Sequence, residues 1–395
     1  MVRRAAVLIT GFLLGHAVVH AQRPAIQQML DAVDADSLVW RLERLSGELP
    51  VNVGEGDTLI LSRHKSQPGN ALAAQWLRQE LQRMGYAPAV EHFGGAGENI
   101  LAVKAGALHP ERKVYISAHY DCMPGVAVAP GADDDGSGVC AVLEAARVMA
   151  DMDFENTVVF ALWDEEEQGM LGSAYHAAAA AGNDELVAAV VQMDAIAYDG
   201  NGDGLLRIHA RPVANSIAIK DSALMVNTTY GPGLPIAVNN PGATYSDHAS
   251  FWSEGYGAIL LVEDFDNDPN PHYHTPNDRM AYLDTGYWRG ITQLAIGTAA
   301  AMAVPTGPAG VGQAVSRVEL KVFPNPAAGE VHVQVAGASP GAQCSLVDAT
   351  GRPVRNWSGP VPAGGLVLKG LPPGTYLLRV QEAAMHAVQR IVVLP

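Results

Sequence analysis

The 395-residue chain has little cysteine and a shortage of positive charge. Its three cysteines cannot form a disulfide framework, and no Cys-x-x-Cys pair is present. We expect Cys122 and Cys140 to be buried free thiols. Lys and Arg total 25 against 41 Asp and Glu, which gives a formal net charge of −16. Because a phosphate backbone needs a basic surplus to displace its counterions, we expect no nucleic-acid partner.

Long uninterrupted apolar runs are also missing. The longest candidate starts at Ala5, behind Arg3 and Arg4, and is broken by glycines and a histidine short of the ~20 residues that a membrane span needs. A small-x-small cleavage site ends at Ala21. These features predict a signal peptide over residues 1–21 instead of a membrane anchor. We expect an exported protein without a stable membrane span.

Apolar residues are plentiful, at 48% of the chain, so a sizeable core is available. In the middle of the chain, apolar runs that predict strands alternate with amphipathic stretches that predict helices. The predicted strands are 114–118, 156–163, 186–193 and 257–263, and the predicted helices are 26–50, 70–84, 136–150 and 169–181. This order predicts an α/β fold with a mostly parallel mixed sheet and helices on both faces. Such sheets bind ligands at the carboxyl ends of their strands.

The last quarter of the chain changes in character. Residues 306–316 have the Gly/Pro-containing composition of a linker and separate a domain at 22–305 from one at 317–395. The second domain has seven basic and four acidic residues, whereas residues 22–316 have 16 and 37. Its short alternating runs predict a small antiparallel β-sandwich. The runs are 318–323, 330–336, 344–349, 366–371, 375–381 and 387–394.

Candidate metal ligands follow the predicted strands of the first domain. Each motif alone is weak, because an acidic run is usually a solvated turn. Their shared placement after strands of one sheet is informative, since it brings them to one edge. Carboxylates that converge there would repel one another unless cations lay among them, and two divalent ions would neutralise such a site. A mixed set of carboxylates and imidazoles favours zinc. The candidates are His119, Asp121, Asp134, Glu166, Glu167, Asp194 and His274.

At these positions the chain resembles the co-catalytic zinc aminopeptidases of peptidase clan MH, of the leucyl and bacterial aminopeptidase type. The matching stretches are 118–121, 130–139, 161–173, 190–194, 245–251 and 270–275. The resemblance implies a zinc exopeptidase fold over the catalytic domain at 22–305, with two Zn²⁺ ions as cofactors. It also implies peptides as substrates, from which N-terminal residues, apolar ones first, are removed.

The resemblance assigns a role to each candidate. Asp134 would bridge the two ions, His119 and Asp194 would complete one ion, and Glu167 and His274 would complete the other.

Two further carboxylates would serve the same centre. Glu166 would be the general base, taking a proton from the attacking water and passing it to the leaving amine. Asp121 would orient the imidazole of His119 through its second ring nitrogen.

Some positions depart from this family. Relatives carry a disulfide and a tyrosine before the Ser-Asp-His motif, whereas Tyr245 here is displaced from that tyrosine. Ala195 stands where a larger apolar residue is common, which predicts a wider specificity pocket. We interpret Asp247 and His248 as support for the site and not as ligands.

The tail resembles the C-terminal sorting domain of the type IX (Por) secretion system of Bacteroidetes-type bacteria. The matching stretches are 322–326, 370–376 and 390–395. The resemblance implies the type IX machinery as a partner. The protein would be exported to the periplasm and then reach the medium or the cell surface. A generic sandwich, for example one that binds carbohydrate, is the alternative.

Three other functions remain open for the catalytic domain. One is a related zinc hydrolase, such as a carboxypeptidase or a deacylase, although 245–251 and 270–275 are aminopeptidase-like stretches. Another is a glutaminyl cyclase, which would be expected to lack the complete patterns at 130–139 and 161–173. The third is a non-catalytic binding ectodomain, which would have lost ligands that are all present here.

Overall fold

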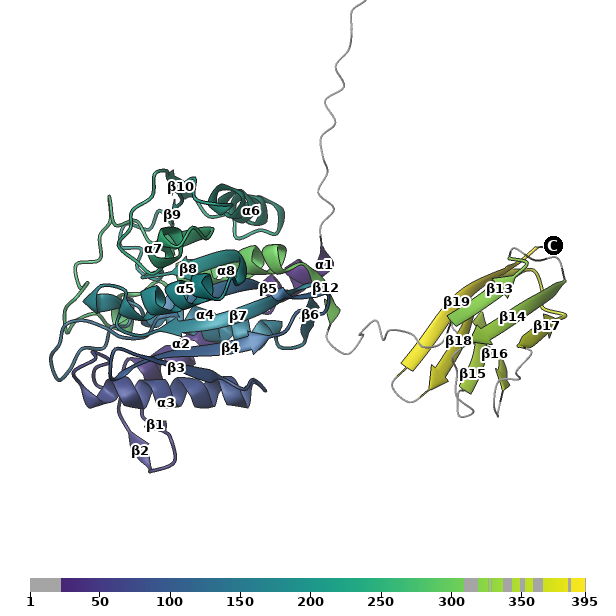
Figure 1. The fold of residues 1–395 in the computed structure, drawn as a ribbon, viewed down its shortest axis with the longest axis horizontal. Helices are drawn as coiled ribbons and strands as arrows, with labels where there is room; N and C mark the ends of the chain where they lie inside the picture. The colour runs from purple at the N-terminus through teal and green to yellow at the C-terminus, as the bar shows by residue number, and fades with distance from the viewer. Residues whose placement is uncertain are drawn as a thin grey trace, which may run out of the picture. The chain divides into compact units, whose positions relative to one another are not determined.

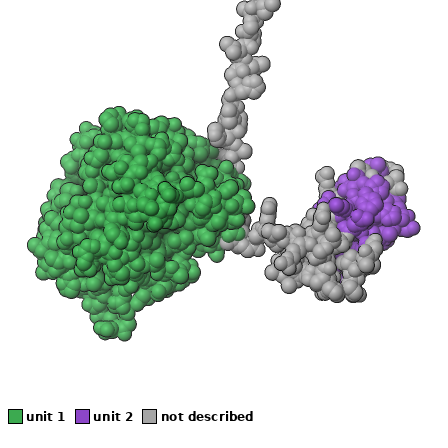
Figure 2. Space-filling view, in the orientation of Figure 1, with its two compact units in different colours: residues 1–309 green, residues 310–395 purple. Residues whose placement is uncertain are grey.

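A computed structural model describes residues 23–308 and, in the tail, residues 319–325, 327, 329–336, 343–348, 352–357, 365–382 and 385–394. The predicted signal peptide at 1–21 lies outside the described residues. The chain divides into two compact units, 1–309 and 310–395, which Figure 2 draws in different colours. Among the described residues, no helix combines the length and the apolar character that crossing a membrane requires.

An eight-stranded mixed sheet organises the first unit (Figure 1). Its strand order is β10 (Ile236–Asn239), β9 (Leu206–His209), β11 (Ala258–Val262), β8 (Leu186–Met193), β5 (His109–His119), β7 (Asn156–Trp163), β4 (Gly97–Lys104) and β3 (Ala89–Phe93). The central strands β11, β8, β5 and β7 are parallel to their neighbours within this group. Strands β4 and β9 join them in antiparallel fashion, and β10 pairs with β9 in parallel. The predicted α/β fold is therefore confirmed.

The register of the central strands brings their carboxyl ends to one edge of the sheet. His119 lies opposite Trp163, Ser117 opposite Gln192, and Gln192 opposite Leu260. Residues that follow β5, β7, β8 and β11 therefore emerge close together.

Helices cover both faces of this sheet. Their bounds are α1 Pro24–Asp31, α2 Ala35–Leu45, α3 Pro68–Arg83, α4 Gly136–Met149, α5 Leu171–Gly182, α6 Ser216–Thr229, α7 His248–Ser253 and α8 Thr285–Ala303. The predicted helix at 26–50 is in fact two helices. The Asp34 side chain accepts the backbone N–H of Asp36 and caps α2, so a new helix starts after the turn at 32–34.

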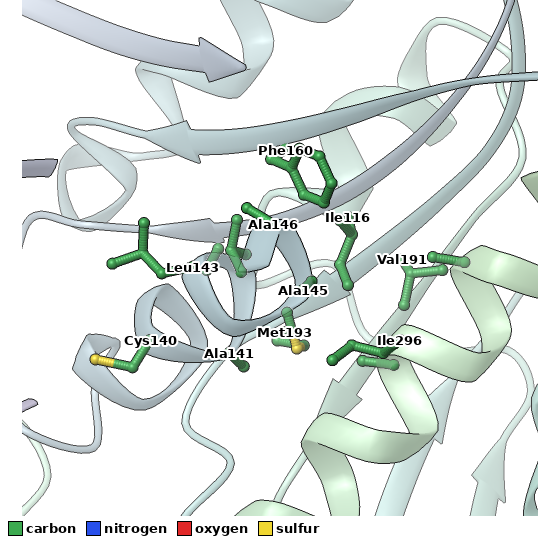
Figure 3. Packing of buried hydrophobic residues seen from close by; sticks show 14 of the residues in the cluster. Ile116, Cys140, Ala141, Leu143, Ala145, Ala146, Phe160, Val191, Met193 and Ile296 are labelled. Carbon is green, nitrogen blue, oxygen red and sulfur yellow. The ribbon is translucent and has the colours of Figure 1, made fainter. Parts of the chain in front are cut away.

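Alternate residues of the strands feed two buried clusters. Ile116 of β5 and Val191 of β8 pack on the face covered by α4 and α8, as Figure 3 shows. Tyr115, the neighbour of Ile116, belongs to the cluster on the opposite face, together with Phe251 of α7 and Ala177 of α5. This alternation is the period of two that a strand imposes on its side chains. A sheet buried on both faces explains why its strands are apolar throughout.

Small strands flank the main sheet. β1 (Val51–Asn52) pairs with β2 (Asp57–Thr58), and β6 (Met152–Phe154) pairs with β12 (Pro305–Pro308). The predicted linker at 306–316 thus differs from the structure at its start, because 306–308 continue a strand of the first unit. Residues 309–316 lie outside the described residues.

The tail forms two antiparallel sheets. One has the order β13 (Glu319–Phe323), β14 (Glu330–Ala336), β17 (Leu366–Lys369), and the other β16 (Pro353–Trp357), β15 (Gln343–Asp348), β18 (Gly374–Glu382), β19 (Met385–Val393). Val331 and Leu368 of the first sheet share one buried cluster with Leu346 and Ile391 of the second. This arrangement confirms the predicted antiparallel sandwich.

Candidate metal centre and active site

The five predicted ligands meet at the carboxyl edge of the central sheet. His119 is the last residue of β5, and Asp194 directly follows β8. Glu167 lies in the 3₁₀ turn η1 (Glu166–Gln168) that follows β7. Asp134 precedes α4, and His274 lies in the loop after β11. Backbone direction accounts for the convergence of His119, Glu167 and Asp194, because parallel strands end at the same edge, whereas Asp134 and His274 come from loops at this edge.

An inner ligand group consists of His119, Asp134 and Asp194, which are all buried. Nε2 of His119 lies 3.3 Å from Oδ1 of Asp134 and 3.5 Å from Oδ1 of Asp194. Both neighbours of the imidazole nitrogen are carboxylate oxygens, which is the donor set of a zinc site.

An outer ligand group consists of Asp134, Glu167 and His274. Nε2 of His274 lies 3.0 Å from Oδ2 of Asp134 and 3.1 Å from Oε2 of Glu167. The His274 side chain is 36% exposed, whereas that of His119 is 1% exposed. Asp134 belongs to both groups and offers one oxygen to each, which is the geometry of a bridging carboxylate.

Several atoms of the centre are buried and, beyond the ion-pair contacts given above, make no hydrogen bond among the described residues. They include Oδ2 of Asp134, Oε1 of Glu167 and Nε2 of His274. Burial raises the pKa of Glu167 to about 7. At Asp134, burial is outweighed by hydrogen bonds and charge from His119 and His274, so its pKa is lowered. The metal-free cluster must therefore hold protons at neutral pH, and divalent cations would take their place. Orphaned carboxylate and imidazole atoms fit two zinc ions.

Glu166 stands beside the inner group without belonging to either group. Its Oε2 lies 3.9 Å from Nε2 of His119. Burial raises the pKa of Glu166 to about 11, and the charges of Asp247 and Asp194 add to this effect. Because cations bound beside it would favour its ionised form, Glu166 is placed to accept a proton from a water molecule there.

Asp121 contacts both the imidazole ring of His119 and the 3₁₀ turn that carries Glu166 and Glu167. Its Oδ1 lies 3.4 Å from Nδ1 of His119, as a carboxylate that orients the imidazole should. Its two oxygens also accept the backbone N–H groups of Glu166, at 3.0 Å, and Glu167, at 3.2 Å. One side chain thus fixes a predicted ligand together with the turn that carries the predicted base.

The comparison with known families agrees with this geometry. Residues 99–299, about half of the chain, match peptidase family M28. The chain belongs to peptidase family M28. The predicted enzyme class, a peptidase of the zinc aminopeptidase type, is confirmed by this membership. Residues 321–394 match the secretion system C-terminal sorting domain, so the predicted sorting tail is confirmed as well.

Individual relatives of this M28 peptidase carry aminopeptidase names. Leucine aminopeptidase 1 of Trichophyton equinum is 29% identical over 313 residues, covering 73% of this chain and 82% of the relative. The LapA aminopeptidase of Legionella pneumophila superposes with a TM-score of 0.60 at 23% identity, over 71% of this chain and 75% of LapA. The glutaminyl cyclase of Porphyromonas gingivalis superposes with a TM-score of 0.51 at 20% identity, over 67% of this chain and 97% of the cyclase. The fold is therefore shared by aminopeptidases and a cyclase.

Sequence reasoning missed residues of the M28 centre that act on the backbone. The buried carboxylate of Asp135 accepts the N–H groups of His119, Gly138 and Ala195, at 3.1, 2.9 and 3.2 Å. It therefore caps α4 and fixes the ends of β5 and β8. Its place in the triplet 133–135 was a signal that could have found it. The buried Asp278 accepts the N–H group of Asp134 at 3.0 Å, and no motif pointed to it.

The Ser-Asp-His motif of this M28 peptidase lies beside the ligands without joining them. Oδ2 of Asp247 accepts from Nε2 of Gln192 at 3.2 Å, and Nε2 of His248 donates to the Ala243 carbonyl at 2.9 Å. Neither residue belongs to a ligand group. Tyr245 is 46% exposed, and its hydroxyl lies 3.3 Å from Nε2 of His209.

Two smaller expectations concern single side chains. Cys122 and Cys140 are free and buried, as predicted. Ala195 is 1% exposed and has a φ of 47°. The wider specificity pocket expected at this position stays a prediction.

Proposed function

We propose that this M28 peptidase is a secreted di-zinc aminopeptidase that removes N-terminal residues, apolar ones first, from peptides. The observation that carries the proposal is the pair of ligand groups that share Asp134. In this assignment His119 and Asp194 complete one ion, and Glu167 and His274 complete the other. Bound zinc supplies a Lewis acid that polarises the scissile carbonyl and lowers the pKa of water towards neutrality.

The protein's own groups would carry the proton. Glu166 takes a proton from the attacking water and passes it to the leaving amine, a role for which it must be ionised, and the positive charge of nearby cations favours that form. Asp121 fixes the turn that carries Glu166 and Glu167 through their backbone N–H groups. In this assignment the Glu167 carboxylate would face the metal ions and the Glu166 carboxylate would face the attacking water. Carboxylates at this edge are also the groups that can bind a free N-terminal ammonium, which would make the enzyme an exopeptidase.

An aromatic row beside the centre supports the apolar preference. We define this row as Tyr245, Phe265 and Tyr273. Their ring centroids are 6.5 Å apart for the first pair and 5.2 Å for the second, and Tyr273 stacks on His274 at 3.8 Å. Tyr245 and Tyr273 are 46% and 41% exposed. Exposed aromatic rings next to a polar centre are suited to pack against an apolar side chain of a substrate.

The two ends of the chain support the proposed location outside the cell or at its surface. A signal peptide at 1–21 would take the protein to the periplasm, and the sorting domain would pass it to the type IX machinery. The medium or the cell surface would then be its place of action.

An assay with free and blocked substrates tests the proposed activity. The mature protein, loaded with zinc, is given leucyl-p-nitroanilide, its N-acetylated form and a peptide with N-terminal glutamine. We expect hydrolysis of the free substrate, no reaction with the acetylated one, and loss of activity after exhaustive chelation. Cleavage of the acetylated substrate would exclude an aminopeptidase, and cyclisation of glutamine without hydrolysis would make the protein a cyclase.

A further inference from the structure

The loop that carries His274 is hydrogen-bonded to the segment that carries Asp134. Asp278 accepts the backbone N–H of Asp133 on Oδ1 at 2.9 Å and that of Asp134 on Oδ2 at 3.0 Å. Its own carbonyl accepts the N–H of Ala132 at 3.2 Å. Nδ2 of Asn270, from the same loop, donates to Oδ2 of Asp133 at 2.8 Å. We call these four hydrogen bonds the loop clasp.

Asp278 is the central member of the loop clasp. It is 1% exposed, and both of its oxygens are used by backbone N–H groups of the neighbouring segment. Removing the carboxylate would leave buried N–H groups unpaired, which is costly. Because Asp278 follows His274 by only four residues, the same bonds fix where the imidazole lies relative to the Asp134 carboxylate.

Two of the three inner ligands, His119 and Asp194, do not depend on this loop, and the third, Asp134, is shared with the outer group. His119 ends β5 and Asp194 directly follows β8, and Asp135 accepts the N–H groups of His119 and Ala195. His274 instead has a left-handed backbone, with φ at 57°, and a partly exposed ring. The sheet therefore positions His119 and Asp194, whereas loop contacts position His274.

We infer that Asp278 is a positioning residue for the outer zinc ion. It holds the Asp134 and His274 donors at the separation that the ion requires, and it acts on the inner ion only through the shared Asp134. This inference rests on the proposed di-zinc function. It concerns a residue that touches neither metal nor substrate and acts through the backbone of the bridging ligand.

Zinc binding to the D278N variant tests the inference. Full-length mature protein is equilibrated against a series of buffered zinc concentrations, and bound zinc, kcat, KM and Tm are measured. We expect the outer ion to bind about 10–100-fold more weakly, the usual effect of losing a partner that orients a ligand. The inner ion, which keeps His119 and Asp194 in place, should be weakened much less. Excess zinc should restore kcat. The matched control is D284N, in which the carboxylate that accepts the Tyr287 N–H at the start of α8 is replaced.

Other outcomes would overturn the inference. Zinc binding by D278N that equals that of D284N would show that Asp278 does not position the outer ion. Equal weakening of both ions, with a lower Tm and no rescue by zinc, would make the residue merely structural. If D278N does not fold, N270A, which removes one bond of the loop clasp, must show the same selective weakening, and equal weakening of both ions would overturn the proposal. A wild-type protein that binds only one zinc would instead overturn the proposed function and the inference with it.

Discussion

The inner and outer ligand groups share one carboxylate and differ in how they are held. The inner group is buried, and two of its three members, His119 and Asp194, sit at the ends of two adjacent parallel strands. The outer group combines a turn after β7 with a loop whose imidazole is 36% exposed. The comparison teaches that one centre can join a rigid half, fixed by the sheet, to an adjustable half, fixed by hydrogen bonds between loops. We expect the two halves to respond differently to substitution.

Replacing the general base should give the largest effect on the reaction. We expect E166Q to keep its zinc and to lose about 10²–10⁴-fold in kcat, the usual worth of a positioned acid–base group. Zinc content and steady-state kinetics measure both properties. The matched control is E165Q, one residue earlier, where the carboxylate pairs with Lys65 at 2.8 Å. If E166Q lost zinc together with activity, Glu166 would be a ligand of the inner half.

Removing one imidazole from each half should give unequal losses of stability. H119A leaves buried carboxylates without their cationic partner, and we expect it to lower the free energy of unfolding by about 3 kcal/mol in zinc-free buffer. H274A also removes a partner from the buried carboxylates of Asp134 and Glu167, but its ring is 36% exposed and water can take part of its place, so we expect a smaller loss of about 1–2 kcal/mol. Urea unfolding of the two variants measures the difference. Equal losses would contradict the contrast between a rigid and an adjustable half.

A pH experiment examines a buried histidine, His209 of β9, that lies outside both ligand groups. Burial lowers the pKa of His209 to about 4, from an ordinary value of 6.5. The unfolded chain therefore takes up this proton near pH 6.5 and the folded protein only near pH 4, so stability falls as the pH drops through that interval. We expect H209Q to lose about 1 kcal/mol less than the wild type between pH 7 and pH 5. H92Q, which replaces an exposed histidine of β3, should keep the wild-type slope.

Removal of the tail should have the smallest effect on chemistry. A protein that spans residues 22–316 retains β12 and both ligand groups, so we expect an unchanged kcat/KM on aminoacyl substrates. In its native host, the shortened protein should stay in the periplasm. Its appearance in the medium would contradict the sorting assignment, and loss of activity in a folded protein would mean that the tail helps to build the centre.

The sequence predicted the central strands better than the surrounding elements. Strands β5, β7, β8 and β11 are long apolar runs, and their ends were located to within a few residues, except for the amino end of β5. The short strands β9 and β10 have four residues each, too few for a periodic signal. Helix α8 is buried on most of its surface, so its small apolar residues do not alternate with polar ones as in an amphipathic helix. The break between α1 and α2 depends on a single cap at Asp34.

The meeting of the proposed ligands at one edge was predictable, because each comes from a segment that follows a strand and has a side chain that can bind a metal ion. Asp278 and the second function of Asp121 were not predictable in this way. Both act on backbone N–H groups of residues distant in sequence, at separations of 144 and 45 residues. A backbone N–H has the same chemistry at every residue except proline, so no residue type at the other end points to these contacts.

Anomalous diffraction at the zinc edge, from crystals of the zinc-loaded protein, tests the central claim most directly. The account predicts two peaks about 3.5–4 Å apart, the usual spacing of a two-metal site. They should lie on either side of the Asp134 carboxylate, one beside His119 and Asp194 and the other beside Glu167 and His274. A single peak, or two peaks that do not share Asp134, would contradict the assignment of a co-catalytic zinc centre.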